Sequence, residues 1–250
     1  MPRAASSGTA APGGAARGGA PVALRLVRAQ PEAAASWAQQ GLTGVHVTGL
    51  SDGWSALTPS TPSSAVPPPY DDPVAVLLNR PVPHRMRPAF GVGVVGRQAL
   101  LTATAGGWRA VPRWVAWQPG VGVVRPGGLA PLRVADLVHL SGSEAPGALG
   151  DVADVLHDPT GSPVETLRRL LAALGLPGGG LLGAPVDDEA RHVTPAPRGV
   201  AAFARMVADD ASWHAEMTAP DDADEGRPSA GRRTDPSTDS PDSPDTEEHR

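Results

Sequence analysis

The placement of the large apolar residues limits the folded part of this 250-residue chain more than any other feature. Every leucine, valine and phenylalanine lies between Val22 and Val207. The flanks hold none of these side chains, so they cannot bury enough apolar surface to offset the entropy cost of ordering. We therefore predict a single folded domain over residues 21–217, a disordered Ala/Gly-rich head over residues 1–20 and a disordered acidic tail over residues 218–250.

The residue types that are missing exclude several kinds of chemistry. The chain has no cysteine and no lysine, and all 21 of its basic residues are arginine. Disulfides, thiolate metal sites, cysteine nucleophiles, the lysine of a P-loop and lysine Schiff bases are thereby excluded. Arginine in place of lysine, together with 30 glycines and 29 prolines, is typical of a bacterial, high-GC coding genome.

The hydropathy pattern gives no indication of a membrane. No apolar run approaches the roughly 18 residues that a membrane span needs. Residues 1–20 also lack the apolar stretch of a secretory signal. We therefore expect a cytoplasmic protein, with the acidic tail serving solubility or, alternatively, binding a partner.

The order of the predicted elements favours an α+β fold. Strands are predicted at 22–28 and 44–48, a helix at 31–40 between them, and an exposed Ser/Thr/Pro-rich linker at 55–69. Four short runs separated by glycine and proline turns predict an antiparallel meander, at 90–95, 99–104, 113–118 and 121–125. Further helices are expected at 71–80, 132–140, 148–157, 163–174 and 198–214. We predict a small antiparallel meander sheet with helices packed on one face.

Two glycine motifs are better explained by composition than by chemistry. Residues 49–53 (GLSDG) match the nucleophile elbow of hydrolases, but a proline-rich segment follows where that motif needs a helix. Residues 91–96 (GVGVVG) match the dinucleotide fingerprint, but no acidic residue follows at the required distance. We interpret the first as a loop and the second as a glycine-rich strand, and we expect no cofactor.

The pattern that best indicates a function is a long segment without acidic residues. Between Asp72 and Asp136 the chain has eight arginines, three tryptophans and no acid, whereas nine acids accompany two arginines from Asp136 to Glu189. Arginine and tryptophan are the residues that most often anchor protein interfaces. The candidate binding residues are Arg85, Arg87, Trp108, Arg109, Arg113, Trp114 and Trp117.

We therefore expect a non-catalytic binding or protein-interaction module whose Arg/Trp-rich face, about residues 80–133, docks an acidic protein. A structural alternative is that these arginines pair with the acidic helices and that the tryptophans are core. Trp114 and Trp117 point to opposite sides of a strand, so at least one of them is expected to be buried.

Two other functions stay open. The face could bind single-stranded nucleic acid, although the net charge of −5 counts against this. The chain could instead be a metal- or His/Asp-dependent enzyme that acts on an anionic small molecule, with His84, His139, His157 and Asp158 as its candidate groups. We expect no metal site, because the histidines lack metal-ligand spacings.

Overall fold

The computed structural model describes residues 20–107, 110–187 and 189–218. Within this part the chain forms an eight-stranded antiparallel sheet with helices, which confirms the predicted α+β class. The chain divides into two units, residues 1–208 and 209–250, and the last helix continues from the first unit into the second. The predicted head, and the predicted tail beyond residue 218, lie outside the described residues; residue 218 itself is helical.

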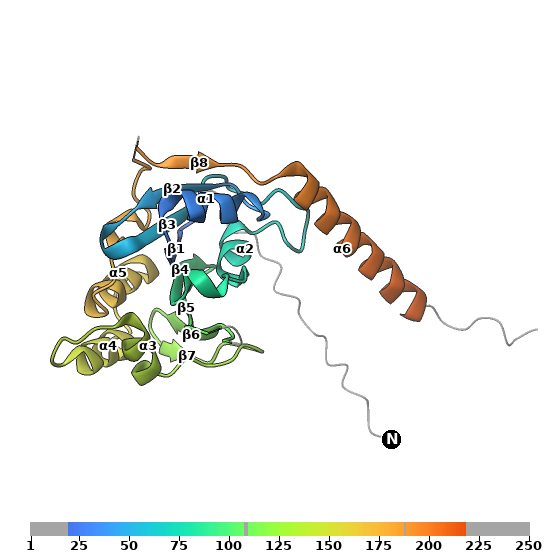
Figure 1. Ribbon diagram of the computed structural model, residues 1–250. Helices are drawn as coiled ribbons and strands as arrows, with labels where there is room; N and C mark the ends of the chain where they lie inside the picture. Colours follow the sequence, from blue (N-terminus) through green and yellow to red (C-terminus); the bar gives the residue numbers. More distant parts are fainter. Residues whose placement is uncertain (1–19, 108–109, 188, 219–250) are drawn as a thin grey trace, which may run out of the picture. The chain divides into compact units, whose positions relative to one another are not determined.

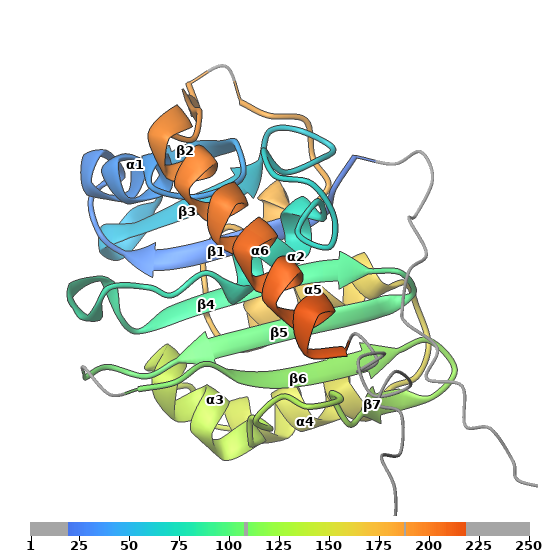
Figure 2. The ribbon, with the colours of Figure 1, turned by 90° about the vertical axis from the view of Figure 1, so that its right-hand side faces the viewer.

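The sheet consists of two halves that meet at the first strand. Its order is β7-β6-β5-β4-β1-β3-β2-β8, and each neighbouring pair is antiparallel (Figure 2). The predicted meander is the half from β4 to β7. The strands are β1 (Ala23–Arg28), β2 (Val45–Gly49), β3 (Trp54–Pro59), β4 (Ala89–Val95), β5 (Gln98–Thr104), β6 (Arg113–Gln118), β7 (Gly122–Val124) and β8 (Arg191–Val193).

The helices lie where the sequence predicts them, and three short 3-10 turns accompany them (Figure 1). None of the helices in the described part is both long and apolar enough to cross a membrane. The helices are α1 (Pro31–Gln39), α2 (Pro73–Asn79), α3 (Val134–Ser141), α4 (Ala148–His157), α5 (Pro163–Ala173) and α6 (Pro197–Thr218), and the 3-10 turns are η1 (Ser51–Gly53), η2 (His84–Met86) and η3 (Gly179–Leu181).

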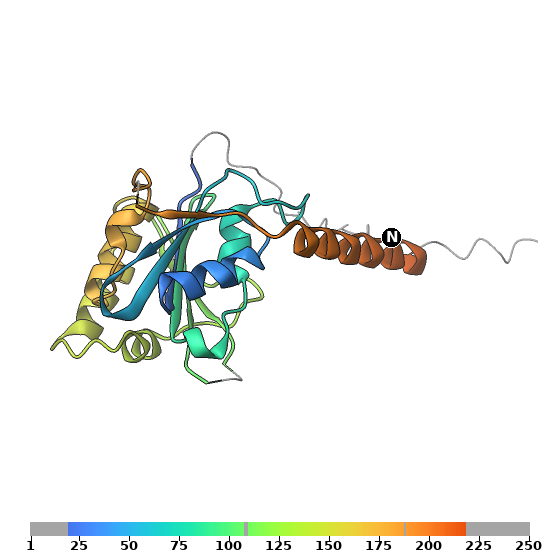
Figure 3. The same ribbon diagram turned by 45° about the horizontal axis from the view of Figure 1, so that its top comes forward.

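The helices divide between the two faces of the sheet. The expectation of helices on one face accounts for α3, α4 and α5, whereas α1 and α2 cover the opposite face (Figure 3). The alternation along β1 shows why: Leu24 and Leu26 pack toward α5, and Ala23 and Val27 pack toward α1 and α2. The near-continuous apolar run of β1 is the pattern typical of a strand that is covered on both faces.

Two helix starts follow their sequence signals directly. The Asp72 carboxylate accepts hydrogen bonds from the backbone N–H groups of Val74 (2.8 Å) and Ala75 (3.3 Å), with Pro73 in the first position of α2. Ser162 caps α5 in the same way, by accepting from the N–H of Glu165 at 3.2 Å. These caps satisfy donors that a helix leaves unpaired, so they fix where each helix begins.

The prediction of an exposed linker over residues 55–69 is wrong for its first five residues. They belong to β3, which lies inside the sheet between β1 and β2. Ser55 is fully buried and donates its hydroxyl to the carbonyl of Ala29 at 2.7 Å, and Leu57 is also buried. A hydroxyl that is paired inside the core costs little, so a Ser/Thr-rich segment can form a central strand. Residues 60–69 form no helix or strand, and most of them are exposed.

Glycines 91 and 93 let β4 pass closely beneath α2. A Cβ atom added to Gly91 would lie 2.6 Å from Nη1 of Arg25 and 2.8 Å from side-chain atoms of Leu78 and Thr102. One added to Gly93 would lie 2.8 Å from a methyl group of Val74. The motif GVGVVG is therefore a strand, as the sequence predicts, and its glycines make room for neighbouring side chains.

We predict that Gly91→Ala destabilises the protein by about 1–3 kcal/mol, because the new methyl group overpacks a buried site. Chemical denaturation monitored by circular dichroism measures this effect. Gly150→Ala is the matched control, since a Cβ at this exposed position of α4 meets nothing within 4 Å. The control should be neutral or stabilise by up to about 1 kcal/mol, as alanine does in a helix. Equal stability of the two variants would contradict the packing described for Gly91.

Candidate functional site

The side chain of Arg80, which follows helix α2, caps the C-terminal end of helix α1. Its guanidinium donates to the carbonyl of Ala38 at 3.2 Å and to the carbonyl of Trp37, both in the last turn of α1. It also stacks on the Trp37 ring, with 4.1 Å between Cζ and the ring centroid. These two carbonyls also accept from the N–H groups of Gln40 (3.1 Å) and Gly41 (2.9 Å), and the partial negative charge at the end of a helix stabilises a cation there.

Arg25 does the same for helix α2 from inside the core. Its side chain is 1% exposed, and Nη1 donates to the carbonyl of Leu78 at 3.1 Å. A longer contact of 3.5 Å joins Nη2 to the carbonyl of Arg80, and Nε has no partner in the described part of the chain. Gly91 and Thr102 on the neighbouring strands border the space that this guanidinium occupies.

Both guanidinium groups have a lowered pKa because they are buried. Burial, and secondly the nearby Arg80, lower the pKa of Arg25 to about 10. Burial lowers the pKa of Arg80 to about 10 as well. Both side chains therefore stay charged at neutral pH, and helix carbonyls rather than carboxylates face them.

A third arginine shapes the loop that follows α2. Arg87 donates from Nε to the carbonyl of Val82 at 2.8 Å, and from Nη1 to the carbonyls of Gly107 (2.6 Å) and Ala110 (3.2 Å). Met86, 2% exposed, anchors the same loop in the core. Arg87 thus holds the 82–87 loop against the end of the β5–β6 connection.

Together these groups form a concave site, the arginine cleft, with a volume of about 550 Å³. Its lining contains one tryptophan, one glutamine, two prolines, one valine, two arginines and one histidine, and it has no acidic residue. The lining residues are Trp37, Gln40, Arg80, Pro81, Val82, Pro83, His84 and Arg87. A pocket of this volume suits a small anionic group or side chain.

The structure separates the residues that the sequence grouped as one Arg/Trp face. Arg87 lines the arginine cleft, and Arg85 is exposed beside it in η2. Arg113, also exposed, lines a second hollow of about 390 Å³ that includes Asp136 and His139 of α3. Trp108 and Arg109 lie outside the described residues.

The binding role predicted for Trp114 and Trp117 does not agree with their burial. They are 3% and 1% exposed, and they pack into the two hydrophobic clusters on opposite faces of the sheet. The indole N–H of Trp117 donates to the carbonyl of Asp158 at 3.2 Å. Both side chains are therefore core, because the helical layers on both faces cover the alternating positions of β6.

The arginines of the acid-free segment do not pair with the acidic helices in the described part of the chain. The two ion pairs there are Arg169–Asp158 at 2.7 Å and His214–Asp210 at 3.6 Å. Arg97, Arg125 and Arg133 are exposed, as Arg85 and Arg113 are. The positive charge of this segment is thus left facing solvent or the cleft.

The candidate groups for an enzyme are dispersed. His84 lines the arginine cleft and His139 the second hollow. Nδ1 of His157 donates to the carbonyl of Ala153 at 2.8 Å, and the neighbouring Asp158 caps a turn. Hydrogen bonds from Thr160, then from Arg169, lower the pKa of Asp158 to about 2. No group of three metal-ligating side chains occurs among the residues that were placed.

The lining of the cleft includes Trp37 and Gln40, which the sequence analysis did not single out. It did not single out Arg25 either, whose guanidinium contacts the backbone carbonyl of Arg80 behind the cleft. The available sequence signal for Arg25 was an arginine in the middle of the apolar run VALRLVR. It pairs across the sheet with Gly91, so a glycine opposite an arginine marks the space for a buried guanidinium.

The chain matches no protein-family model, and no curated protein or solved structure resembles it significantly. Its function therefore has to be inferred from the chemistry of its own residues.

We predict that Arg80→Lys lowers the free energy of unfolding by about 1–2 kcal/mol. Lysine can neither stack as a plane on Trp37 nor donate to both carbonyls with a fixed fork. Urea denaturation gives the change in midpoint. Arg97→Lys, on the exposed turn between β4 and β5, should change stability by less than about 0.5 kcal/mol. Equal midpoints for the two variants would contradict the capping role of Arg80.

Proposed function

We propose that this chain is a non-catalytic binding module whose arginine cleft takes an acidic segment of a partner protein. The observation that carries the proposal is the charge of the cleft. Arg80 and Arg87 line it, His84 adds a titratable group, Arg85 stands beside it, and its lining has no carboxylate. A concave surface with one sign of charge concentrates the field and attracts ligands of the opposite sign.

The donors available to a ligand favour a carboxylate. Arg87 donates its hydrogen bonds from Nε and Nη1, and its Nη2 has no hydrogen-bond partner among the described residues. The His84 ring is exposed at the same wall. Guanidinium and imidazolium N–H groups form charge-assisted hydrogen bonds with carboxylates, and these are stronger than neutral ones. Pro81, Val82 and Pro83 offer apolar contact to the stem of an aspartate or glutamate.

The buried tryptophans make single-stranded nucleic acid a weaker candidate. Non-specific binding of single strands relies on aromatic rings on which bases stack. Trp114 and Trp117 belong to the core, so they cannot serve as that platform. The candidate groups of the enzyme alternative, His84, His139, His157 and Asp158, are dispersed over the described structure. At the second hollow, no hydrogen bond of the described structure joins His139 to Asp136 or Arg113.

We expect fluorescein-labelled hexaglutamate to bind the chain at low salt, and hexaglutamine not to bind. Because rim charges are screened within about 10 Å at 0.1 M salt, the affinity should fall as salt is raised. Fluorescence anisotropy measures both. Tighter binding of a labelled oligo-dT strand than of hexaglutamate would favour the nucleic-acid alternative and contradict the proposal.

The variant Arg85→Glu should weaken hexaglutamate binding by about tenfold or more, because it places a negative charge, which repels the peptide, beside the cleft. Arg125→Glu is the matched control, since it makes the same change of net charge at an exposed position after β7. It should leave the affinity almost unchanged. An equal loss in both variants would show that overall charge, and not the cleft, attracts the peptide.

A further inference from the structure

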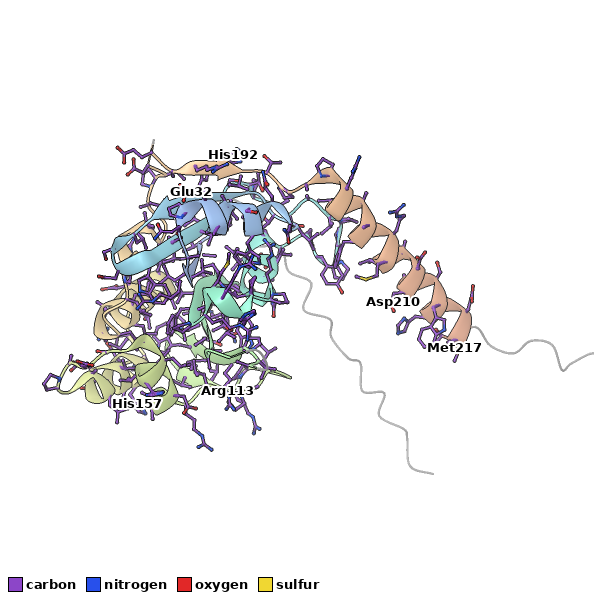
Figure 4. The ribbon with its side chains drawn as sticks, in the orientation of Figure 1. Glu32, Arg113, His157, His192, Asp210 and Met217 are labelled. Atoms are coloured by element: carbon purple, nitrogen blue, oxygen red, sulfur yellow. The ribbon has the colours of Figure 1, made fainter. Side chains whose placement is uncertain are left out.

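Two histidines face each other at the outer edge of the sheet, away from the arginine cleft. β8 is an edge strand whose sheet partner is β2, and His192 lies directly opposite His46 in their register. The ring centroids are 5.2 Å apart, with 38° between the ring planes. Figure 4 shows His192 at this edge, whereas His157 and Arg113 lie toward the opposite end of the sheet.

The neighbouring valines determine which face the histidines occupy. Val45 and Val193, one residue away on each strand, are buried in the cluster with α1 and α2. Because side chains alternate along a strand, His46 and His192 point to the other face. His46 is partly exposed there and His192 is exposed, so solvent and ions have access to the pair.

Each ring has one nitrogen available to a ligand. Nε2 of His192 is 3.1 Å from the hydroxyl of Ser60, which fixes the ring orientation and leaves Nδ1 for another partner. Nδ1 of His46 is buried and has no hydrogen-bond partner in the described part of the chain, so Nε2 is the nitrogen that solvent and ions can reach. For His192, the Ser60 hydroxyl on the far nitrogen is the kind of second partner that a metal-binding imidazole usually has.

The spacing of the rings matches shared coordination. Two imidazoles bound to one tetrahedral ion through metal–nitrogen bonds of about 2.0–2.1 Å place their centroids about 5 Å apart. We propose that His46 and His192 form a two-histidine site for a divalent transition-metal ion of the Zn²⁺, Ni²⁺ or Cu²⁺ class, completed by water. Imidazole nitrogen suits these ions, whereas Mg²⁺ and Ca²⁺ prefer oxygen ligands.

A metal ion at this position would fasten β8 to β2. β8 has only three residues and contributes one buried side chain, Val193, so few contacts hold it. The segment after β8 leads into α6, which begins at Pro197. The site thus links metal binding to the attachment of this edge strand.

The test is isothermal titration of ZnCl₂, NiCl₂ and CuCl₂ into the tag-free, full-length chain after dialysis against EDTA. We expect binding to this site in the wild type, and at least a tenfold lower affinity in His46→Gln and in His192→Gln. His157→Gln is the matched control because His157 is exposed on another element, and it should bind as the wild type does. Ser60→Ala should weaken binding by about tenfold, as the loss of an outer-shell partner does.

Two structural readouts test the arrangement itself. The Cu²⁺ complex should show two nitrogen ligands by electron paramagnetic resonance, and one in His192→Gln, whose exposed edge position allows the variant to fold. Hydrogen exchange of the amides at 191–193 should slow with Zn²⁺ in the wild type and not in His192→Gln. Absence of binding in the wild type, or equal affinity in His192→Gln and His157→Gln, would overturn the proposal.

Discussion

The pairing of arginine side chains with the carboxyl ends of helices is the interaction on which the rest of this structure depends. Arg25 binds the carbonyl end of α2 and Arg80 that of α1, so each helix is tied to a neighbouring element by a cation. Helix carbonyls can stabilise these charges without carboxylates. The consequence is a region in which helix carbonyls, and not carboxylates, face the arginines, so that it stays positive. The same arginine that ends α1 also forms a wall of the arginine cleft.

Much of the fold could be predicted from sequence because its signals are local. Asp72 with Pro73 and Ser162 with Glu165 set helix starts, and glycine turns separate the strands of the meander. β3 was missed because its serine and threonine resemble a linker, although Ser55 has its partner 26 residues earlier. β8 was missed because three residues with one buried side chain carry no periodicity. Both strands are fixed by distant partners, which no local pattern contains.

The sequence indicates the positive charge of the candidate site but not the arrangement of its side chains. The acid-free segment contains Arg87, which lines the cleft, and Arg85, which is exposed beside it, but its two described tryptophans are core. The tryptophan that does line the cleft, Trp37, comes from α1, some forty residues before. Its role depends on stacking with Arg80, a contact between elements that only the folded chain brings together. This arrangement is the reason we propose an acidic protein segment, as the sequence favours, and not the single-stranded nucleic acid that it left as an alternative.

The most direct test of the cleft as the binding site is an NMR titration of the isotope-labelled chain with hexaglutamate. The account predicts chemical-shift changes concentrated at the Trp37 indole N–H and at the backbone amides of residues 82–87, saturating together with one apparent affinity. Shifts spread evenly over exposed arginines such as Arg97, Arg125 and Arg133, with the Trp37 indole unchanged, would contradict it.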